Sequence, residues 1–114
     1  MTKSLPKVSL PKAVEAYIAA KNAHDPEAAA QTFAEDGIVH DEAKVHRGRA
    51  EIAAWTSDTV EKYRMTMTPL SATERGGKTV VIAKVEGTFP GSPIDLTFNF
   101  ELGDDGIRSL KVGA

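Results

Sequence analysis

Apolar residues recur at helical spacing in three stretches of this chain, and each stretch predicts an amphipathic helix. The first stretch runs from Pro11 to about Ala23. Its apolar positions are expected to face inward: Leu10, Val14, Tyr17 and Ile18. Its polar positions are expected on the opposite, solvent-facing side: Lys12, Glu15 and Lys21.

Capping residues and apolar spacing predict the other two helices. Asp25 is a suitable N-cap and Pro26 suits a first helical turn, so a second helix is predicted from about Pro26 to Phe33. Gly37 is expected to end it. A third helix is predicted from Arg49 to Tyr63, with an inward stripe made of Ile52, Trp55, Thr59, Val60 and Tyr63.

Apolar and polar residues alternate in the remaining segments, which predicts β-strands. A short strand is expected at Ile38–Asp41, followed by a polar loop over residues 42–48. With a period of two, Val39 and Asp41 share one face of this strand and His40 points to the other. Four more strands are expected between glycine- and proline-rich turns: Met65–Thr73, Thr79–Phe89, Ile94–Leu102 and Ile107–Val112.

The order of these elements predicts an α+β domain, because the helices come first and the antiparallel strands second. One face of the sheet is apolar, and the three N-terminal helices are the available cover for it. We therefore expect a curved, mixed but mostly antiparallel sheet that forms a cone with the helices and encloses an internal pocket. Pro69 predicts an edge strand or a bulge. Residues 1–9 are expected to be a flexible arm, and residues 10–114 a single domain.

Composition and charge narrow the classes of function. The chain has 114 residues, a formal net charge of −2 and no cysteine. This charge argues against a nucleic-acid-binding module and a polybasic membrane anchor, and the absent cysteines exclude disulfides and thiolate zinc sites. The histidines at positions 24, 40 and 46 lack a paired metal-binding spacing, so neither a metal nor a cofactor is expected. No secretion signal or membrane-spanning run is found, and a cytoplasmic location is expected.

Two short segments resemble a known superfamily. They are Asn22-Ala23-His24-Asp25 at the end of the first helix and Phe33-Ala34-Glu35-Asp36 near the first strand. With the order helix, helix, short strand, helix and meander, the chain resembles the nuclear transport factor 2-like (cystatin-like) superfamily over about residues 10–112. Within it, the chain is similar to the SnoaL-like group, which includes polyketide cyclases and ketosteroid isomerases.

The resemblance to ketosteroid isomerase implies roles for two residues. In that enzyme a tyrosine of the first helix binds the developing enolate oxygen, and an aspartate of the first short strand moves the proton. These positions fall on Tyr17 and Asp41 of this chain. The isomerase also uses a second, protonated aspartate as an oxyanion donor. At the corresponding inward position this chain has Leu96, while Asp95 is expected to face outward.

The candidate catalytic residues are Asp41, Tyr17 and His40. An apolar cavity raises the pKa of a carboxyl group toward the range that a general base needs, which favours Asp41 in that role. Alternatively, Asp41 caps the following loop or pairs with Arg47 or Arg49, and Tyr17 is a core tyrosine bonded to a backbone carbonyl. The candidate pocket residues are aromatic, with plain core packing as the alternative: Phe33, Trp55, Phe89, Phe98 and Phe100.

Two functions remain open from the sequence. The first is a cofactor-independent isomerase, cyclase or dehydratase in which Asp41 removes a proton next to a carbonyl and Tyr17 stabilises the oxygen charge. The second is a non-catalytic ligand-binding or dimerisation module of the same fold. The expected partners are a small hydrophobic molecule and a second copy of the chain, which would pair through the polar face of the sheet.

Overall fold

The computed structural model describes residues 10–41 and 43–113, so the predicted arm at residues 1–9 lies outside the described residues. Three helices and six strands follow one another in the order that the α+β prediction requires. The elements are α1 (Lys12–Asn22), α2 (Pro26–Gln31), β1 (Phe33–Asp41), β2 (Lys44–Arg47), α3 (Gly48–Tyr63), β3 (Thr66–Arg75), β4 (Lys78–Glu86), β5 (Ile94–Gly103) and β6 (Gly106–Gly113).

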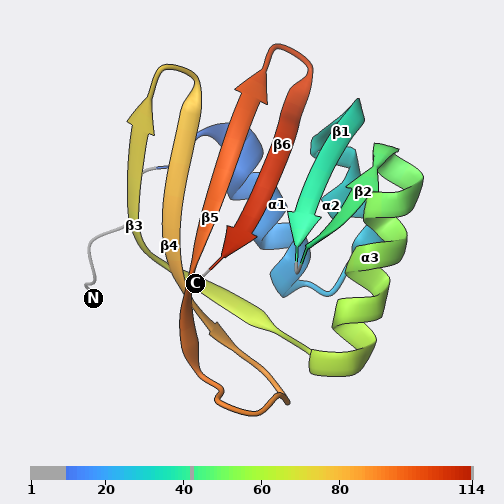
Figure 1. Cartoon of the computed structure of the whole chain (residues 1–114), viewed down its shortest axis with the longest axis vertical. Coiled ribbons are helices and arrows are strands. Elements are labelled where there is room, and N and C mark those ends of the chain that lie inside the picture. The colour runs from blue at the N-terminus through green and yellow to red at the C-terminus, as the bar shows by residue number, and fades with distance from the viewer. Residues whose placement is uncertain (1–9, 42, 114) are drawn as a thin grey trace, which may run out of the picture.

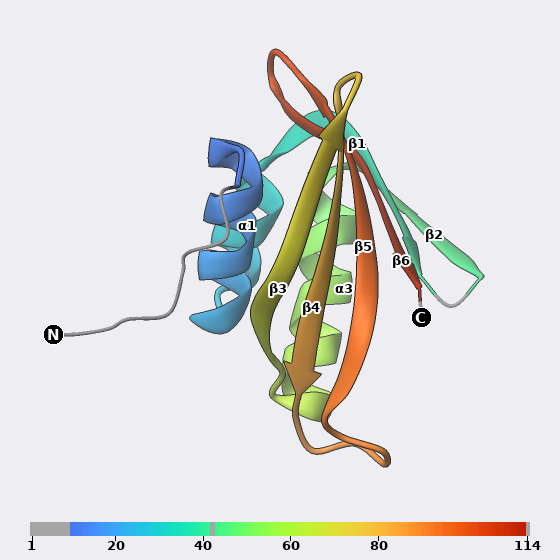
Figure 2. The same cartoon turned by 90° about the vertical axis from the view of Figure 1, so that its left-hand side faces the viewer.

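The six strands form one curved, mixed sheet in the order β2-β1-β6-β5-β4-β3 (Figure 1). Neighbouring strands are antiparallel except β1 and β6, which run parallel. Figure 2 shows α1 and α3 on the same side of this sheet. β3 is an edge strand, and its register with β4 shifts between Pro69 and Ser71, as Pro69 predicted. The α+β cone is thus confirmed.

The buried core lies between the helices and the inner face of the sheet. Every second residue of β4 is buried from Thr79 to Val85, which confirms the period-two pattern of this strand. Val14, Tyr17 and Ile18 of α1 are buried against the inner face of the sheet. On the outer face, Asp95 is exposed as predicted. A homodimer through this outer face stays a prediction.

The predicted boundary between α2 and β1 is wrong. The helix ends at Gln31, and β1 already begins at Phe33, which pairs with Ile107 of β6. Gly37 lies inside β1 rather than at a helix end. A Cβ atom on Gly37 would come within 2.9 Å of the Phe33 ring. Glycine is therefore needed here to let the Phe33 side chain pack against its own strand.

The predicted loop at residues 42–48 is also wrong in part. Residues Lys44–Arg47 form the short strand β2, which pairs antiparallel with Ile38–Asp41. Two residues connect β1 and β2, and one of them, Ala43, has a positive φ of 65°. Tight hairpins need such left-handed residues, and the sequence offers no glycine at this point to indicate one. β2 matters for function because it places His46 beside α3.

Candidate active site

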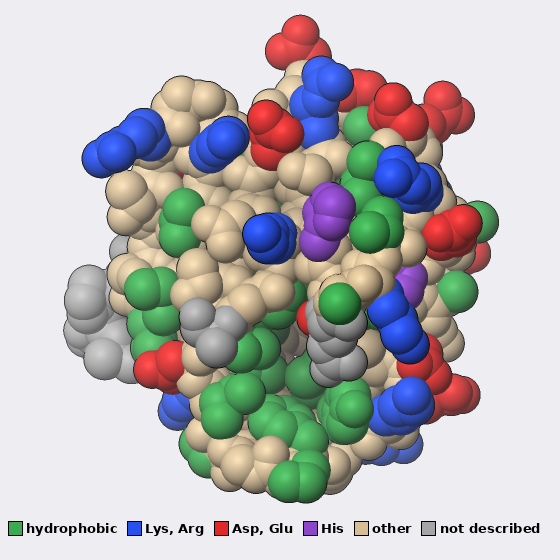
Figure 3. Space-filling view, viewed as in Figure 1, with side chains coloured by type: hydrophobic (Ala, Val, Ile, Leu, Met, Phe, Trp, Pro, Cys, Tyr) green, Lys and Arg blue, Asp and Glu red, His purple; other side chains and the backbone are tan. Residues whose placement is uncertain are grey.

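A cavity of about 720 Å³ opens between α1, α3 and the inner face of the sheet. Most of its wall is apolar: Trp55, Tyr63, Met65, Met67, Val85, Leu96 and Phe98. Figure 3 shows hydrophobic side chains gathered at the lower end of the molecule, where the β4–β5 connection lies. From this connection and the start of β5, Phe89, Pro90 and Ile94 also line the cavity. A pocket of this size and character suits a small hydrophobic ligand.

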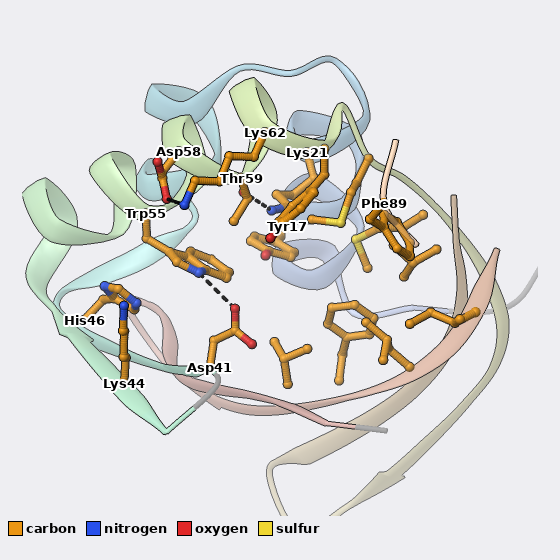
Figure 4. A pocket seen from close by; sticks show the side chains of 18 of the residues that line it. Tyr17, Lys21, Asp41, Lys44, His46, Trp55, Asp58, Thr59, Lys62 and Phe89 are labelled. Atoms are coloured by element: carbon orange, nitrogen blue, oxygen red, sulfur yellow. Dashed lines mark hydrogen bonds and ion pairs between the residues drawn. The ribbon is translucent and has the colours of Figure 1, made fainter. Parts of the chain in front are cut away.

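The Asp41 carboxylate lies in this cavity and is held by a tryptophan. The Trp55 indole N–H donates a hydrogen bond of 3.1 Å to Oδ2 of Asp41. The His46 ring stacks on Trp55 with 5.7 Å between ring centroids. Figure 4 shows Asp41, Trp55 and His46 on one side of the cavity. Asp41 therefore bonds to Trp55 rather than pairing with an arginine, and Arg49 bonds to the Phe33 carbonyl instead.

Tyr17 of α1 also lines the cavity, and its hydroxyl has no hydrogen-bond partner among the described residues. The side chain is fully buried and packs edge-on between the rings of Phe33 and Phe100. Burial, and then the charge of Asp41, raise the pKa of Tyr17 above its usual value. The hydroxyl thus keeps its proton and can donate it in a hydrogen bond to a ligand.

Lys21 is a cavity residue that the sequence analysis placed wrongly on the solvent-facing side of α1. Its side chain is only 5% exposed and lines the cavity one helical turn after Tyr17. Its Nζ lies 4.7 Å from the centroid of the Trp55 ring and 3.5 Å from Oγ1 of Thr59. The spacing of four residues from Tyr17 indicated a shared face. The charge of lysine suggested the opposite side, and the contacts of Lys21 with Trp55 and Thr59 could not be seen from the sequence.

The end of α1 that carries Lys21 is fixed to the start of β3. Asn22 accepts a hydrogen bond from the Met67 backbone N–H (2.7 Å) and donates one to the Met67 carbonyl (2.9 Å). The His24 Nε2 lies 3.1 Å from the Met65 carbonyl oxygen. Since these bonds hold α1 against the sheet, Tyr17 and Lys21 have a defined position relative to the cavity.

The structure separates the predicted aromatic pocket residues into two groups. Trp55, Phe89 and Phe98 line the cavity, and their contact with a substrate stays a prediction. Phe33 and Phe100 do not line the cavity; they are buried in the core, where both rings pack edge-on against Tyr17. Leu96 lines the cavity, as expected for its inward position.

His40 is exposed and does not line the large cavity, because its side chain leaves β1 on the face opposite to Val39. It lines a smaller hollow of about 210 Å³ near the β1–β2 hairpin. Among residues 10–41 and 43–113, no three histidine, aspartate or glutamate side chains gather as a metal site would require. No helix within these ranges is long and apolar enough to cross a membrane.

Burial of the charged Lys21 side chain is expected to lower the free energy of unfolding, and a variant can measure this effect. Desolvation lowers the pKa of Lys21 to about 8, against a smaller opposing effect of Asp41. Lys21→Met is therefore expected to raise the free energy of unfolding by about 1–3 kcal/mol at neutral pH. Thr59 does not lose its donor bond in this variant, because its hydroxyl donates to the Thr56 carbonyl.

The gain in the free energy of unfolding from Lys21→Met depends on pH, because the pKa of Lys21 is lowered in the folded chain. Below pH 8 the lysine is charged in both states, and only the folded chain carries the desolvation cost. Between about pH 8 and 10.5 the folded chain releases the proton first, so wild-type stability rises and the gain shrinks. Urea unfolding at both ends of this range measures the difference, with the exposed Lys12→Met as control. A Lys21→Met protein less stable than wild type at neutral pH would contradict the expectation. The other titratable groups lining the cavity are Lys44, His46, Glu51, Asp58, Lys62 and Tyr63.

Comparison with known proteins identifies the family of this chain. The family model of the SnoaL-like domain matches residues 14–109. A putative polyketide cyclase from Sinorhizobium meliloti has 38% sequence identity and a TM-score of 0.86, over 90% of this chain and 94% of that chain. A protein of ketosteroid isomerase-like fold from Catenulispora acidiphila, in complex with trimethylamine, has 24% identity and a TM-score of 0.82, over 93% and 87% of the two chains.

A third similar structure has a named role. It is an epoxide hydrolase/cyclase-like enzyme of pyran ring formation in the polyether salinomycin, with 23% identity and a TM-score of 0.78 over 90% of this chain and 87% of that chain. No sequence among the curated proteins matches this chain. The match over residues 14–109 shows that the chain belongs to the SnoaL-like domain family.

Proposed function

We propose that this protein is a cofactor-independent enzyme that removes a proton next to the carbonyl group of a small hydrophobic compound. Isomerases, cyclases that close a ring by aldol addition and dehydratases share this step. The observation that carries the proposal is that the Asp41 carboxylate and the Tyr17 hydroxyl line the same largely apolar cavity. A non-catalytic module would not need an acidic group and an unpartnered donor in one ligand-sized space.

Asp41 acts as the general base. Trp55 binds Oδ2 and fixes the orientation of the carboxylate, so Oδ1 is the atom that takes the proton from the carbon next to the carbonyl. Asp41 is half-buried, and the apolar wall limits the contact of the developing charge with water once a substrate fills the cavity. The same carboxyl group then returns the proton to another atom of the substrate, which restores the carboxylate.

Tyr17 stabilises the oxygen charge that develops as the proton leaves. Its hydroxyl is already desolvated and has no protein partner among the described residues, so binding to an oxyanion costs no competing bond. Its ring is held on both sides by Phe33 and Phe100, which keeps the donor in place. A donor fixed before the reaction stabilises a transition state more than a mobile one.

The comparisons support a small ligand and a polyketide-type substrate. The Sinorhizobium meliloti protein, at 38% identity, is named for cyclisation of polyketides, which carry carbonyl groups along an apolar chain. The neighbour that binds trimethylamine shows a small molecule held by a protein of this fold. Both agree with a cavity of about 720 Å³.

Proton exchange of a simple ketone tests the proposal. 2-Tetralone is a bicyclic, apolar ketone with acidic hydrogens next to its carbonyl, and heavy water replaces them as the enolate forms and is reprotonated. We expect the protein to accelerate this exchange, followed by proton NMR, well above the rate with an equal concentration of acetate. Binding of 2-tetralone without faster exchange would favour the non-catalytic ligand-binding module.

A further inference from the structure

Lys21 is a cation with few partners in an apolar cavity. Its hydrogen bond to Oγ1 of Thr59 is long at 3.5 Å, and its Nζ lies 4.7 Å from the centroid of the Trp55 ring. It forms no ion pair with a described residue. A buried lysine usually has a carboxylate partner, because an uncompensated charge is costly to bury. The position of Lys21 therefore calls for an explanation other than stability.

The surroundings of Lys21 favour the uncharged amine. Burial lowers the pKa of Lys21 to about 8, so the fraction of free amine near neutral pH is on the order of a hundredfold above that of an ordinary lysine. Desolvation in an apolar pocket is one of the ways in which proteins activate a lysine as a nucleophile. Asp41 across the cavity acts in the opposite direction on this pKa, by its charge.

Two groups suited to assist a reaction at Lys21 line the same cavity. Tyr17 lies one helical turn before Lys21 on α1 and has a free hydroxyl donor, while Asp41 faces the cavity from β1. Figure 4 shows Tyr17 and Lys21 reaching into the cavity from α1, with Asp41 on the facing wall. An amine, a hydroxyl donor and a carboxylate are the groups needed for addition to a carbonyl and for the proton transfers that follow.

We propose that Lys21 forms an imine with an aldehyde or ketone bound in the cavity. The lysine nitrogen attacks the carbonyl carbon, a C–N bond forms, and the carbonyl C–O bond breaks. The oxygen leaves as water with the two protons that begin on the lysine nitrogen, so no oxidant or reductant takes part. Tyr17 donates a hydrogen bond to the departing oxygen, and Asp41 relays protons from nitrogen to oxygen.

This inference rests on the proposed function only in taking the cavity to bind a carbonyl compound. It does not require Asp41 to remove a proton from carbon. An imine makes the neighbouring hydrogens of a ketone more acidic than the ketone itself does, because its protonated nitrogen withdraws electrons more strongly than oxygen. Lys21 would therefore assist the removal of the same proton by Asp41, whereas an aldehyde without such a hydrogen would form the imine and react no further.

Reductive trapping with 2-naphthaldehyde tests the inference. This aldehyde has no hydrogen on the carbon next to its carbonyl, so its reaction is independent of enolate formation. Sodium cyanoborohydride reduces the imine to a stable amine, and peptide mass spectrometry then locates the naphthylmethyl group. We expect labelling of Lys21 at least about tenfold faster than of Lys12, which is exposed on the same helix.

Variants and a competitor separate the outcomes. Lys12→Arg is expected to label at Lys21 as the wild type does, and Lys21→Arg and Lys21→Met are expected to lose the fast labelling. A cavity ligand such as 2-naphthol should protect Lys21 in the wild-type protein, which keeps the test decisive if a variant fails to fold. Labelling of Lys21 no faster than that of Lys12, or no protection by 2-naphthol, would overturn the inference.

The same experiment distinguishes this inference from the proposed function. Wild-type protein that exchanges 2-tetralone and is labelled at Lys21, with the exchange lost in Asp41→Asn and the labelling lost in Lys21→Arg, supports both. Fast 2-tetralone exchange without labelling of Lys21 overturns the imine and leaves the general base in place. Labelling of Lys21 in wild-type protein that does not accelerate exchange supports the imine and contradicts the general base.

Discussion

Asp41→Asn is expected to lower the rate of 2-tetralone exchange by roughly 10²–10⁴-fold, the usual contribution of a general base. The amide cannot take a proton from carbon at neutral pH. It can still accept the hydrogen bond from the Trp55 indole, which holds Oδ2 of Asp41 at 3.1 Å in the wild type. The loss should therefore come from chemistry, with the fold and the cavity kept.

The control for this variant lies on the outer face of the sheet. Asp95→Asn removes the same charge from an exposed position of β5 that does not line the cavity, so its exchange rate should equal that of the wild type. Proton NMR of 2-tetralone in heavy water measures both variants, and circular dichroism checks their folding. Exchange by folded Asp41→Asn protein at the wild-type rate would remove Asp41 from the mechanism.

Tyr17→Phe is expected to lower the exchange rate by about 10²–10³-fold, as removal of one oxyanion donor does in other enzymes. The same variant should not lose stability. The Tyr17 hydroxyl has no partner among the described residues, so its removal breaks no hydrogen bond and relieves the desolvation of a buried polar group.

The two measurements on Tyr17→Phe together separate function from structure. Urea unfolding should give a free energy of unfolding equal to or above that of the wild type, since the ring still packs between Phe33 and Phe100. A loss of both activity and stability would show that the hydroxyl serves the fold. Unchanged exchange would show that the oxyanion is bound by another group.

Tyr17 and Lys21 share a property that is typical of functional sites. Each is a buried polar group without a full set of partners, and each is expected to lower the free energy of unfolding. Both come from one face of α1 and line one cavity. Groups that cost stability persist where a ligand completes their interactions, which is why their coincidence in this cavity supports a small-molecule site.

Much of the fold could be predicted from the sequence because its patterns are local. Asp25 and Pro26 predicted the start of α2, and Asp25 caps it through a 3.1 Å bond to the Ala28 N–H. The alternation in β4 and β5 predicted which side chains face the core. The boundary between α2 and β1 was wrong because a non-local contact determines it: Phe33 pairs with Ile107 of β6 and so belongs to the strand.

The site was less predictable than the fold for a physical reason. Strand parity placed Asp41 toward the cavity and His40 away from it, because the period of a strand is fixed. Lys21 was placed wrongly because charge usually indicates solvent. Its burial depends on the packing of α3 against α1, which brings Trp55 and Thr59 of α3 next to the Lys21 side chain. The hydrogen bond between Trp55 and Asp41 likewise joins α3 to β1, and no pattern in the sequence indicates that these two side chains meet.

A crystal structure of the protein with 2-naphthol would show whether Asp41 and Tyr17 act on one bound molecule, because this flat compound resembles the enolate that 2-tetralone would form. We predict 2-naphthol inside the cavity, with its oxygen at hydrogen-bonding distance from the Tyr17 hydroxyl and the adjacent ring carbon facing Oδ1 of Asp41. A cavity that stays empty at saturating 2-naphthol, or a ligand whose oxygen points away from both residues, would contradict this prediction.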